Sequence, residues 1–200
     1  ISAGAFALVT IGSASTLSGT FSITSADVNG LFVQVNSLNS LPSATLTGVN
    51  VGTNVTLVLA AAGNWQVPFT IAGTGAGGRG ALRLDTNNIT LSGGLTLAGS
   101  ALITQNINAV TSIISSNIGE STVGSALSLG TQGGSTGTIA LSGNNTFTGG
   151  LSIDVTNVRI DSAGALNSTT PNRVTFANTS VVKNLSLNGN SITIASLVST

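Results

Sequence analysis

Short runs in which aliphatic residues alternate with Ser or Thr recur along the whole chain. A two-residue period places the aliphatic side chains on one face and the hydroxyl side chains on the other, as a half-buried β-strand requires. The runs are about three to six residues long, which predicts many short strands. They cover residues 8–11, 20–23, 45–47, 55–59, 89–91, 95–97, 138–141, 151–155, 185–187 and 191–194.

Residues that favour turns separate these runs. A Gly pair at 93–94 and another at 149–150 each lie between two runs, and Asn188 and Gly189 lie between the last two. Gly and Asn tolerate the positive φ that tight turns demand. An Asn-Gly pair between strands is a hairpin signal, so by itself it favours an antiparallel β-sandwich. The alternative is a corner of a parallel β-helix, at which the chain bends onward.

Repetition favours the β-helix. Residues 87–97 and 144–153 each contain an Asn pair, a short run, a Gly pair and a second run, and they lie about 57 residues apart. That interval matches two or three coils of a solenoid. With ~20 residues per coil the chain would form about nine or ten coils. Asn side chains aligned between coils would form hydrogen-bonded ladders. We therefore expect an all-β, parallel β-helix (β-solenoid), with an antiparallel β-sandwich as the alternative.

Composition supports an ordered β protein. Hydrophobic residues make up 41% of the chain and the net charge is zero, whereas disordered chains combine low hydrophobicity with high net charge. Strong helix formers such as Glu, Lys, Arg and Met are scarce, which disfavours long helices. Only 4% of the residues are aromatic, so the core must be aliphatic, and 26 Gly residues supply the turns.

Several classes of site and partner are disfavoured. The chain contains neither Cys nor His, which excludes disulfides, thiolate metal sites and Ser-His-Asp or Cys-His catalysis within it. Basic residues form no stripe, so we expect no nucleic-acid partner. The longest apolar run, residues 57–62, is far shorter than the roughly 18 residues of a membrane span. We expect no membrane span, no cofactor and no metal ion.

A stretch in the second half of the chain resembles a known repeat. Residues 137–166 read GTIALSGNNTFTGGLSIDVTNVRIDSAGAL, which is similar to the module GTLTLSGxNTYTGGTTVxxGTLxLGSxGAL of the autotransporter-associated β-strand repeats. Residues 185–197, LSLNGNSITIASL, resemble the element that often follows that module. Residues 78–88 look like a degenerate earlier copy, and residues 1–64 are similar only in general character.

The resemblance implies a right-handed parallel β-helix from the passenger of a secreted bacterial surface protein. It also implies an extracellular or cell-surface location, and its motif carries no catalytic residues. We expect one solenoid over residues 1–200. Within it, residues 1–64 would form divergent coils, residues 65–120 a degenerate repeat and residues 121–200 the best-matching repeat.

The acidic residues offer one candidate cluster. Asp154 and Asp161, with Arg159 between them, would hold a Ca²⁺ ion or a uronate if they converged in a groove. The alternative is a surface ion pair, because Arg159 and Asp161 lie two residues apart and share a face of one strand. Arg83 and Asp85 have the same spacing and the same alternative, an exposed pair worth roughly 0–1 kcal/mol.

Two further features have competing interpretations. Trp65 is the one Trp of the chain and would either stack against a sugar or cover the core at a corner of a coil. Residues 73–78 match G-x-G-x-x-G, but a strand-like stretch follows and Asp85 comes too early for a dinucleotide site. We interpret that loop as a turn, an excursion from the coil or a hinge. The candidate ligand contacts are therefore Trp65, Arg159 and Asp161.

We expect the function to depend on the stacked coils of the solenoid and not on a binding pocket. We expect a non-enzymatic, structural extracellular rod. A glycan-binding adhesin module is the alternative, and a polysaccharide-acting β-helix enzyme is a third hypothesis. Residues 5–11 and 181–198 are apolar and nearly free of the charges that protect strand edges. We therefore predict self-association end to end, and glycans are the other candidate partners.

Overall fold

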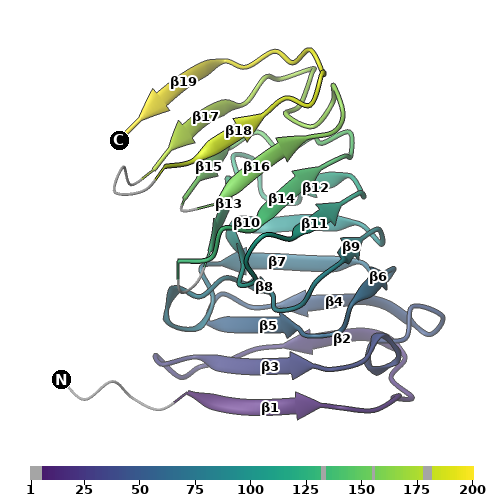
Figure 1. The fold of residues 1–200 in the computed structure, drawn as a ribbon. Helices are drawn as coiled ribbons and strands as arrows, with labels where there is room; N and C mark the ends of the chain where they lie inside the picture. Colours follow the sequence, from purple (N-terminus) through teal and green to yellow (C-terminus); the bar gives the residue numbers. More distant parts are fainter. Residues whose placement is uncertain (1–5, 132–133, 155, 178–181) are drawn as a thin grey trace.

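The computed structural model is a parallel β-solenoid of about eight stacked turns (Figure 1). It describes residues 6–131, 134–154, 156–177 and 182–200. Every strand pair that these residues form is parallel. The predicted β-solenoid is confirmed, and the antiparallel β-sandwich, which was the alternative, is wrong.

The strands lie on three faces of the coil. The first face runs from one end of the described chain to the other (Figure 1), and neighbouring strands on it are hydrogen-bonded in a fixed order. Its strands are β1 (Ala7–Ile11), β3 (Leu31–Val35), β5 (Val55–Leu59), β8 (Leu82–Leu84), β10 (Leu95–Gln105), β13 (Leu127–Thr131), β15 (Leu151–Ile153), β17 (Arg173–Phe176) and β19 (Ser196–Ser199).

The other two faces are shorter. The second face contains β2 (Gly19–Ile23), β4 (Leu46–Val51), β7 (Phe69–Gly73), the first part of β10 and β12 (Ile118–Glu120). The long strand β10 therefore crosses a corner, and its pairing with β7 shifts register between Leu97 and Ala101. The third face is a separate sheet of β6 (Gly63–Trp65), β9 (Ile89–Leu91), β11 (Thr111–Ile114), β14 (Thr138–Leu141), β16 (Asn157–Ile160) and β18 (Asn184–Ser186).

Helix is confined, in the part of the chain that the structure describes, to two three-residue 3-10 turns. These are η1 (Leu38–Ser40) and η2 (Ala76–Gly78). Ser37 caps η1 by accepting a hydrogen bond from the backbone of Asn39. The described residues contain no helix of the length and apolarity that crossing a membrane requires.

Inward-facing aliphatic side chains stack in columns along the solenoid axis. On the first face, strand register aligns one residue of each coil with the equivalent residue of the next. Burying each such side chain contributes roughly 1.5–3 kcal/mol. One such column contains Val9, Val33, Leu57, Leu82, Ile103, Leu129, Ile153 and Phe176.

The coils are longer than the sequence suggested. Register partners on the first face lie between 21 residues apart, as for Leu82 and Ile103, and 26 residues apart, as for Ile103 and Leu129. The prediction of nine or ten coils is therefore wrong, since the chain forms only about eight coils. Each coil needs a strand on up to three faces and a turn at every corner, and excursions such as residues 73–81 add length.

Most of the predicted strands are present, with one exception near the C-terminus. The runs at 55–59, 89–91 and 138–141 coincide with β5, β9 and β14. The run at 191–194 forms no strand, although Ile192 and Ile194 are partly buried and pack against the core. The last strand begins after it, at Ser196. Val155, at the end of the predicted run 151–155, lies outside the described residues, as do Ala5 and Val181 of the apolar termini.

The two similar segments occupy different corners of the coil. The Gly pair at 93–94 leads from β9 on the third face to the second face, whereas the Gly pair at 149–150 leads into β15 on the first face. The structural equivalent of Thr90 is Ile113 and then Ala140, so residues 141–143 correspond to residues 91–93. The two segments that match in sequence at an interval of about 57 residues are therefore not structurally equivalent. They lie one corner apart on the coil, because Gly pairs occur at more than one corner.

The described chain has one main core. Its buried residues run from Ile23 to Val174 and include side chains from all three faces. The third face begins only at β6, so the first coils have strands on two faces. Those coils fall within residues 1–64, where the resemblance to the repeats is weakest. The subdivision at 64 and 120 stays a prediction.

Candidate functional site

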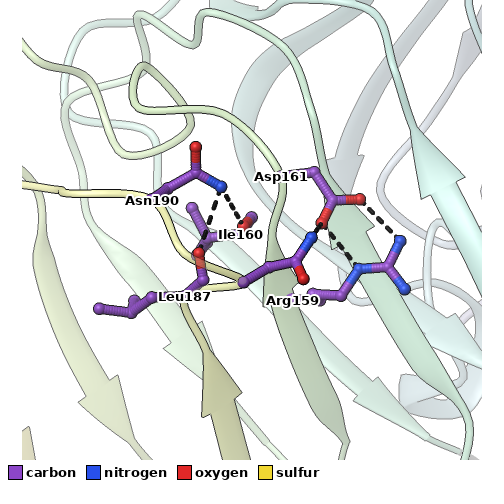
Figure 2. A network of polar contacts seen from close by, with 6 residues as sticks. Arg159, Ile160, Asp161, Leu187 and Asn190 are labelled. Carbon is purple, nitrogen blue, oxygen red and sulfur yellow. Dashed lines mark hydrogen bonds and ion pairs between the residues drawn. The ribbon is translucent and has the colours of Figure 1, made fainter.

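Arg159 and Asp161 meet on the outside of the third face, as their two-residue spacing predicts. Arg159 Nε donates to Asp161 Oδ1 at 2.7 Å, and Arg159 Nη2 donates to Asp161 Oδ2 at 2.7 Å (Figure 2). Asn188, on the following coil, donates from Nδ2 to Asp161 Oδ1 at 2.9 Å. The hydrogen bond from Arg159 lowers the pKa of Asp161, and the same bond raises the pKa of Arg159. The predicted ion pair is confirmed.

Further hydrogen bonds involving the same two coils lie beside that ion pair. Asn190 Nδ2 donates to the carbonyl of Ile160 at 2.9 Å and to that of Leu187 at 3.2 Å (Figure 2). Asn188 and Gly189 have φ values of 47° and 79°, and the turn closes with a 2.8 Å bond from Asn190 N to Leu187 O. This is the geometry of a hairpin turn, used here to round a corner. Both Asp161 oxygens already accept hydrogen bonds within the chain, and the Arg159 guanidinium is directed at them, so the two side chains neutralise each other.

The other acidic residues do not join this cluster. Asp154 follows β15 on the first face, whereas Asp161 follows β16 on the third face. Within the described ranges, no three Asp, Glu, His or Cys side chains come close enough together to hold a metal ion. The candidate Ca²⁺ or uronate site thus reduces to an ion pair within one coil, which a hydrogen bond from Asn188 links to the following coil.

Glu120 has a structural role that the sequence did not indicate. Its carboxylate accepts hydrogen bonds from Thr148 Oγ1 at 2.6 Å, Thr148 N at 3.1 Å and Ser125 N at 3.0 Å. Burial tends to raise the pKa of Glu120, but these hydrogen bonds outweigh it and the pKa is lowered. The side chain thus joins the corner after β12 to the coil above. Residues 28 positions apart meet here, which no local pattern reveals.

Trp65 belongs to the core. Its side chain is only 1% exposed, and Nε1 donates to the carbonyl of Ala61 at 3.2 Å. It stands at the end of β6, where it covers the interior at a corner. Sugar stacking requires an accessible ring face, which Trp65 does not offer in this structure. Of the three candidate ligand contacts, Trp65 is therefore buried, and Arg159 and Asp161 are paired with each other.

The Gly-rich loop at 73–80 folds back over the outside of the first face. Ala76 N donates to Thr56 Oγ1 at 3.0 Å, and Thr104 Oγ1 donates to the carbonyl of Arg79 at 2.7 Å. A side chain at Gly75 would place its Cβ 2.0 Å from the carbonyl oxygen of Gly80, so the fold requires Gly there. This is the predicted excursion from the coil, and it buries the outward residues of β5.

The excursion brings a cation over two aromatic rings. The guanidinium carbon of Arg79 lies 5.1 Å from the ring centre of Phe6 and 5.4 Å from that of Phe32. The two rings meet edge to face at 4.9 Å between centres. Beside them, Arg83 and Asp85 form the predicted ion pair, with Nε and Oδ1 2.7 Å apart.

These residues line a groove of about 250 Å³ on the outer surface. It offers a cation, aromatic rings, aliphatic surface and a charged pair with planar hydrogen-bonding groups. A sugar ring with an acidic substituent has matching chemistry, because its apolar face packs on rings and its carboxylate pairs with Arg. The groove is lined by Phe6, Leu8, Phe32, Gln34, Val58, Arg79, Arg83 and Asp85.

Sequence reasoning missed this groove for a structural reason. Phe6, Phe32 and Arg79 belong to different coils and meet only because the coils stack in register. One signal was present in the sequence. Phe32 occupies an outward position of its strand, between the position of Leu31 and the inward Val33, where most strands of this chain carry Ser or Thr.

Comparison of the chain with protein-family models, with curated proteins and with solved structures found no match. The resemblance to autotransporter-associated repeats therefore depends on residues 137–166 and 185–197 alone and stays a prediction.

Proposed function

We propose that this chain is a structural rod of an extracellular bacterial surface or matrix protein, and not an enzyme. The observation that carries the proposal is the unbroken ladder of the first face, from β1 to β19, over a continuous aliphatic core. Such a stack forms a stiff rod, since every inner coil is hydrogen-bonded to both neighbouring coils. The resemblance of residues 137–166 to passenger repeats supports the extracellular location.

Electron microscopy of the purified chain, together with small-angle X-ray scattering, tests the rod. We expect elongated particles whose long axis corresponds to the stacked coils. A compact particle in both measurements would overturn the proposal. So would breakdown of a polysaccharide that is lost in Asp154→Asn or Asp161→Asn, since the chain would then be an enzyme.

A glycan-binding module is the second candidate, favoured by the groove beneath Arg79. Binding to an array of acidic and neutral oligosaccharides tests it, with the Arg79→Ala variant as the probe. We expect binding of acidic oligosaccharides that weakens at least about tenfold in that variant. Arg173→Ala is the matched control, because Arg173 is exposed on the same face but lies outside the groove. Equal loss in both variants, or no binding at all, would eliminate this candidate.

A further inference from the structure

Both ends of the solenoid leave strand edges without a neighbour among the described residues. At the N-terminal end β1 pairs only with β3, and β2 pairs only with β4. At the C-terminal end β19 pairs only with β17, and β18 pairs only with β16. Figure 1 places these edges at opposite ends of the stack. Unpaired parallel edges present backbone donors and acceptors that a further coil can satisfy.

Where the structure describes the chain, the apolar interior is also open at both ends. A hollow of about 380 Å³ lies at the C-terminal end, and Leu197 on its rim is 62% exposed. At the N-terminal end the inward-facing Val9 is 47% exposed. The hollow is lined entirely by apolar side chains, namely Phe176, Leu185, Leu187, Ile192, Ile194 and Leu197.

The described ends carry few of the charges that keep strand edges apart. The first charged residue of the sequence is Asp27, and the last charged side chain is that of Lys183. Inward positions on the first β-strand, such as Val9 and Ile11, start the columns of the core. Ser199 ends the column of Val9, and Leu197 ends the neighbouring column that contains Leu151 and Val174. Apart from Lys183, which directly precedes the edge strand β18, the described end surfaces are therefore uncharged, and their columns are aligned with one another through the stack.

We propose that copies of this chain stack head to tail, with the N-terminal coil of one copy seated on the C-terminal coil of another. This deepens the proposed rod and rests on it. The contact would continue the interface that joins every pair of successive coils inside the molecule. Continuing its register places Ala7 of the incoming copy over Leu197 and Val9 over Ser199.

The direction of stacking follows from the parallel strands. An incoming copy that is translated along the axis keeps its strands parallel to those it joins, as all internal pairs are. It also brings partly buried apolar residues of its first coil, including Leu17 and Phe21, toward the hollow. A copy turned end for end would present antiparallel strands and would break the columns.

Two end variants test the proposal. Val9→Lys places a charge at the N-terminal end, and Leu197→Lys places one at the C-terminal end. Both positions are largely exposed in the single copy, so the fold should remain, which circular dichroism and the melting temperature would check. We expect the wild-type chain to form oligomers that lengthen with concentration in analytical ultracentrifugation. Each variant should associate at least about 100-fold more weakly, since burying an unpaired charge is costly.

Mixing the two variants tests the direction. Val9→Lys keeps an intact C-terminal end and Leu197→Lys keeps an intact N-terminal end, so an equimolar mixture should form dimers but nothing larger. Val123→Lys is the control, because Val123 is 87% exposed and lies at neither end. It should assemble like the wild type.

Three results would overturn the stacking. They are a wild-type chain that stays monomeric at all concentrations, dimers of a single end variant alone, and oligomers insensitive to both variants. A monomer that is still elongated in scattering would leave the proposed rod standing. A monomer that is compact would remove the rod as well.

Discussion

At the scale of single residues, buried amide and hydroxyl side chains join the coils by bonding to backbone atoms. Asn145 is 3% exposed; its Oδ1 accepts from Ile118 N and its Nδ2 donates to Ala165 O, each at 2.8 Å. Asn172 accepts from Gly150 N at 3.1 Å. The sequence predicted ladders of Asn side chains bonded to one another. The described Asn side chains instead mostly satisfy backbone groups that turn away from the sheets at the corners.

Gln105 is one of several buried side chains with unsatisfied polar atoms, and it yields a prediction. It is fully buried, and neither Nε2 nor Oε1 has a hydrogen-bond partner. Its column contains Leu59 and Leu84 on the preceding coils and Thr131 on the next coil. Replacing Gln105 with Leu removes the buried, unsatisfied amide, so we expect the free energy of unfolding to rise by about 1–3 kcal/mol. Urea denaturation measures this change.

Gln34→Leu serves as the control for that substitution. Gln34 faces outward and its Nε2 already donates to Asn36 Oδ1 at 2.8 Å. We expect no gain in stability there, because no buried amide is relieved. If Gln105→Leu destabilised the protein, Gln105 would have to be solvated or bonded in the folded state.

The ion pair of Arg159 and Asp161 should make stability depend on pH. Arg159 lowers the pKa of Asp161 below its ordinary value of 3.8. A group with a lowered pKa in the folded state stabilises the protein above its unfolded pKa, and that contribution is lost as the pH falls through the folded value. We expect Asp161→Asn to lower stability at pH 7 by on the order of 1 kcal/mol or less.

As the pH falls below the ordinary carboxyl value of 3.8, the difference between the wild type and Asp161→Asn should shrink, because the carboxyl is then increasingly protonated. Thermal melts across the pH range measure it. Asp27→Asn, in an exposed loop, provides the comparison. A difference between Asp161→Asn and the wild type that stayed constant from pH 7 to pH 2 would refute the role of the charge.

At the scale of elements, the two-residue period predicted the strands and the ion pairs. Arg159 with Asp161, and Arg83 with Asp85, pair because residues two apart on a strand share a face. Corners were harder to predict. Gly and Asn pairs indicate that the chain turns, but they do not indicate which face of the solenoid the next strand joins. Asn188 and Gly189 adopt hairpin dihedrals although β18 and β19 lie on different faces.

Contacts between coils could not be predicted for a related reason. The number of residues per coil varies, so the sequence does not reveal which residues of successive coils are neighbours. Glu120 and Thr148 meet across such an interval, and so do Phe32 and Arg79. Trp65 was predicted either to cover the core or to bind a sugar, and only the stacked coils show that it is buried.

The Gly pair before β15 tests how closely the coils approach. A Cβ on Gly149 would lie 2.3 Å from the carbonyl oxygen of Gly124 and 2.4 Å from Ala126 N, which are backbone atoms that cannot rotate away. We expect Gly149→Ala to lower the free energy of unfolding by about 1–3 kcal/mol. Urea denaturation of the variant measures this.

Gly119→Ala is the matched substitution. Gly119 lies on β12, and the nearest atom to its added Cβ would be Thr146 Oγ1 at 3.6 Å, an ordinary contact. It should change stability by less than about 0.5 kcal/mol. Equal costs for the two substitutions would contradict the role of the close approach at Gly149, because restricting the unfolded backbone by itself favours the folded state.

At the scale of the whole molecule, stability is a sum over neighbouring coils. Each inner coil exchanges backbone hydrogen bonds with a coil on either side, whereas the first and last coils have one described neighbour each. In such a linear array the ends open more readily than the middle. Because each end coil has only one described neighbour, it is less stable than an inner coil. For the same reason, a further coil stacked on an end would add more stabilising contacts there than elsewhere.

Hydrogen–deuterium exchange of the dilute chain should follow this gradient. We expect amides of β5, β8 and β13 to exchange slowest and those of β1 and β19 to exchange fastest, because local opening of an end coil breaks half as many inter-coil contacts. Raising the protein concentration should slow exchange in β1 and β19 and leave β8 unchanged, since stacking covers only the ends. Val9→Lys and Leu197→Lys should remove that concentration dependence. Terminal strands already protected in a dilute monomer would contradict both the gradient and the stacking, because those edges would then be covered within a single chain.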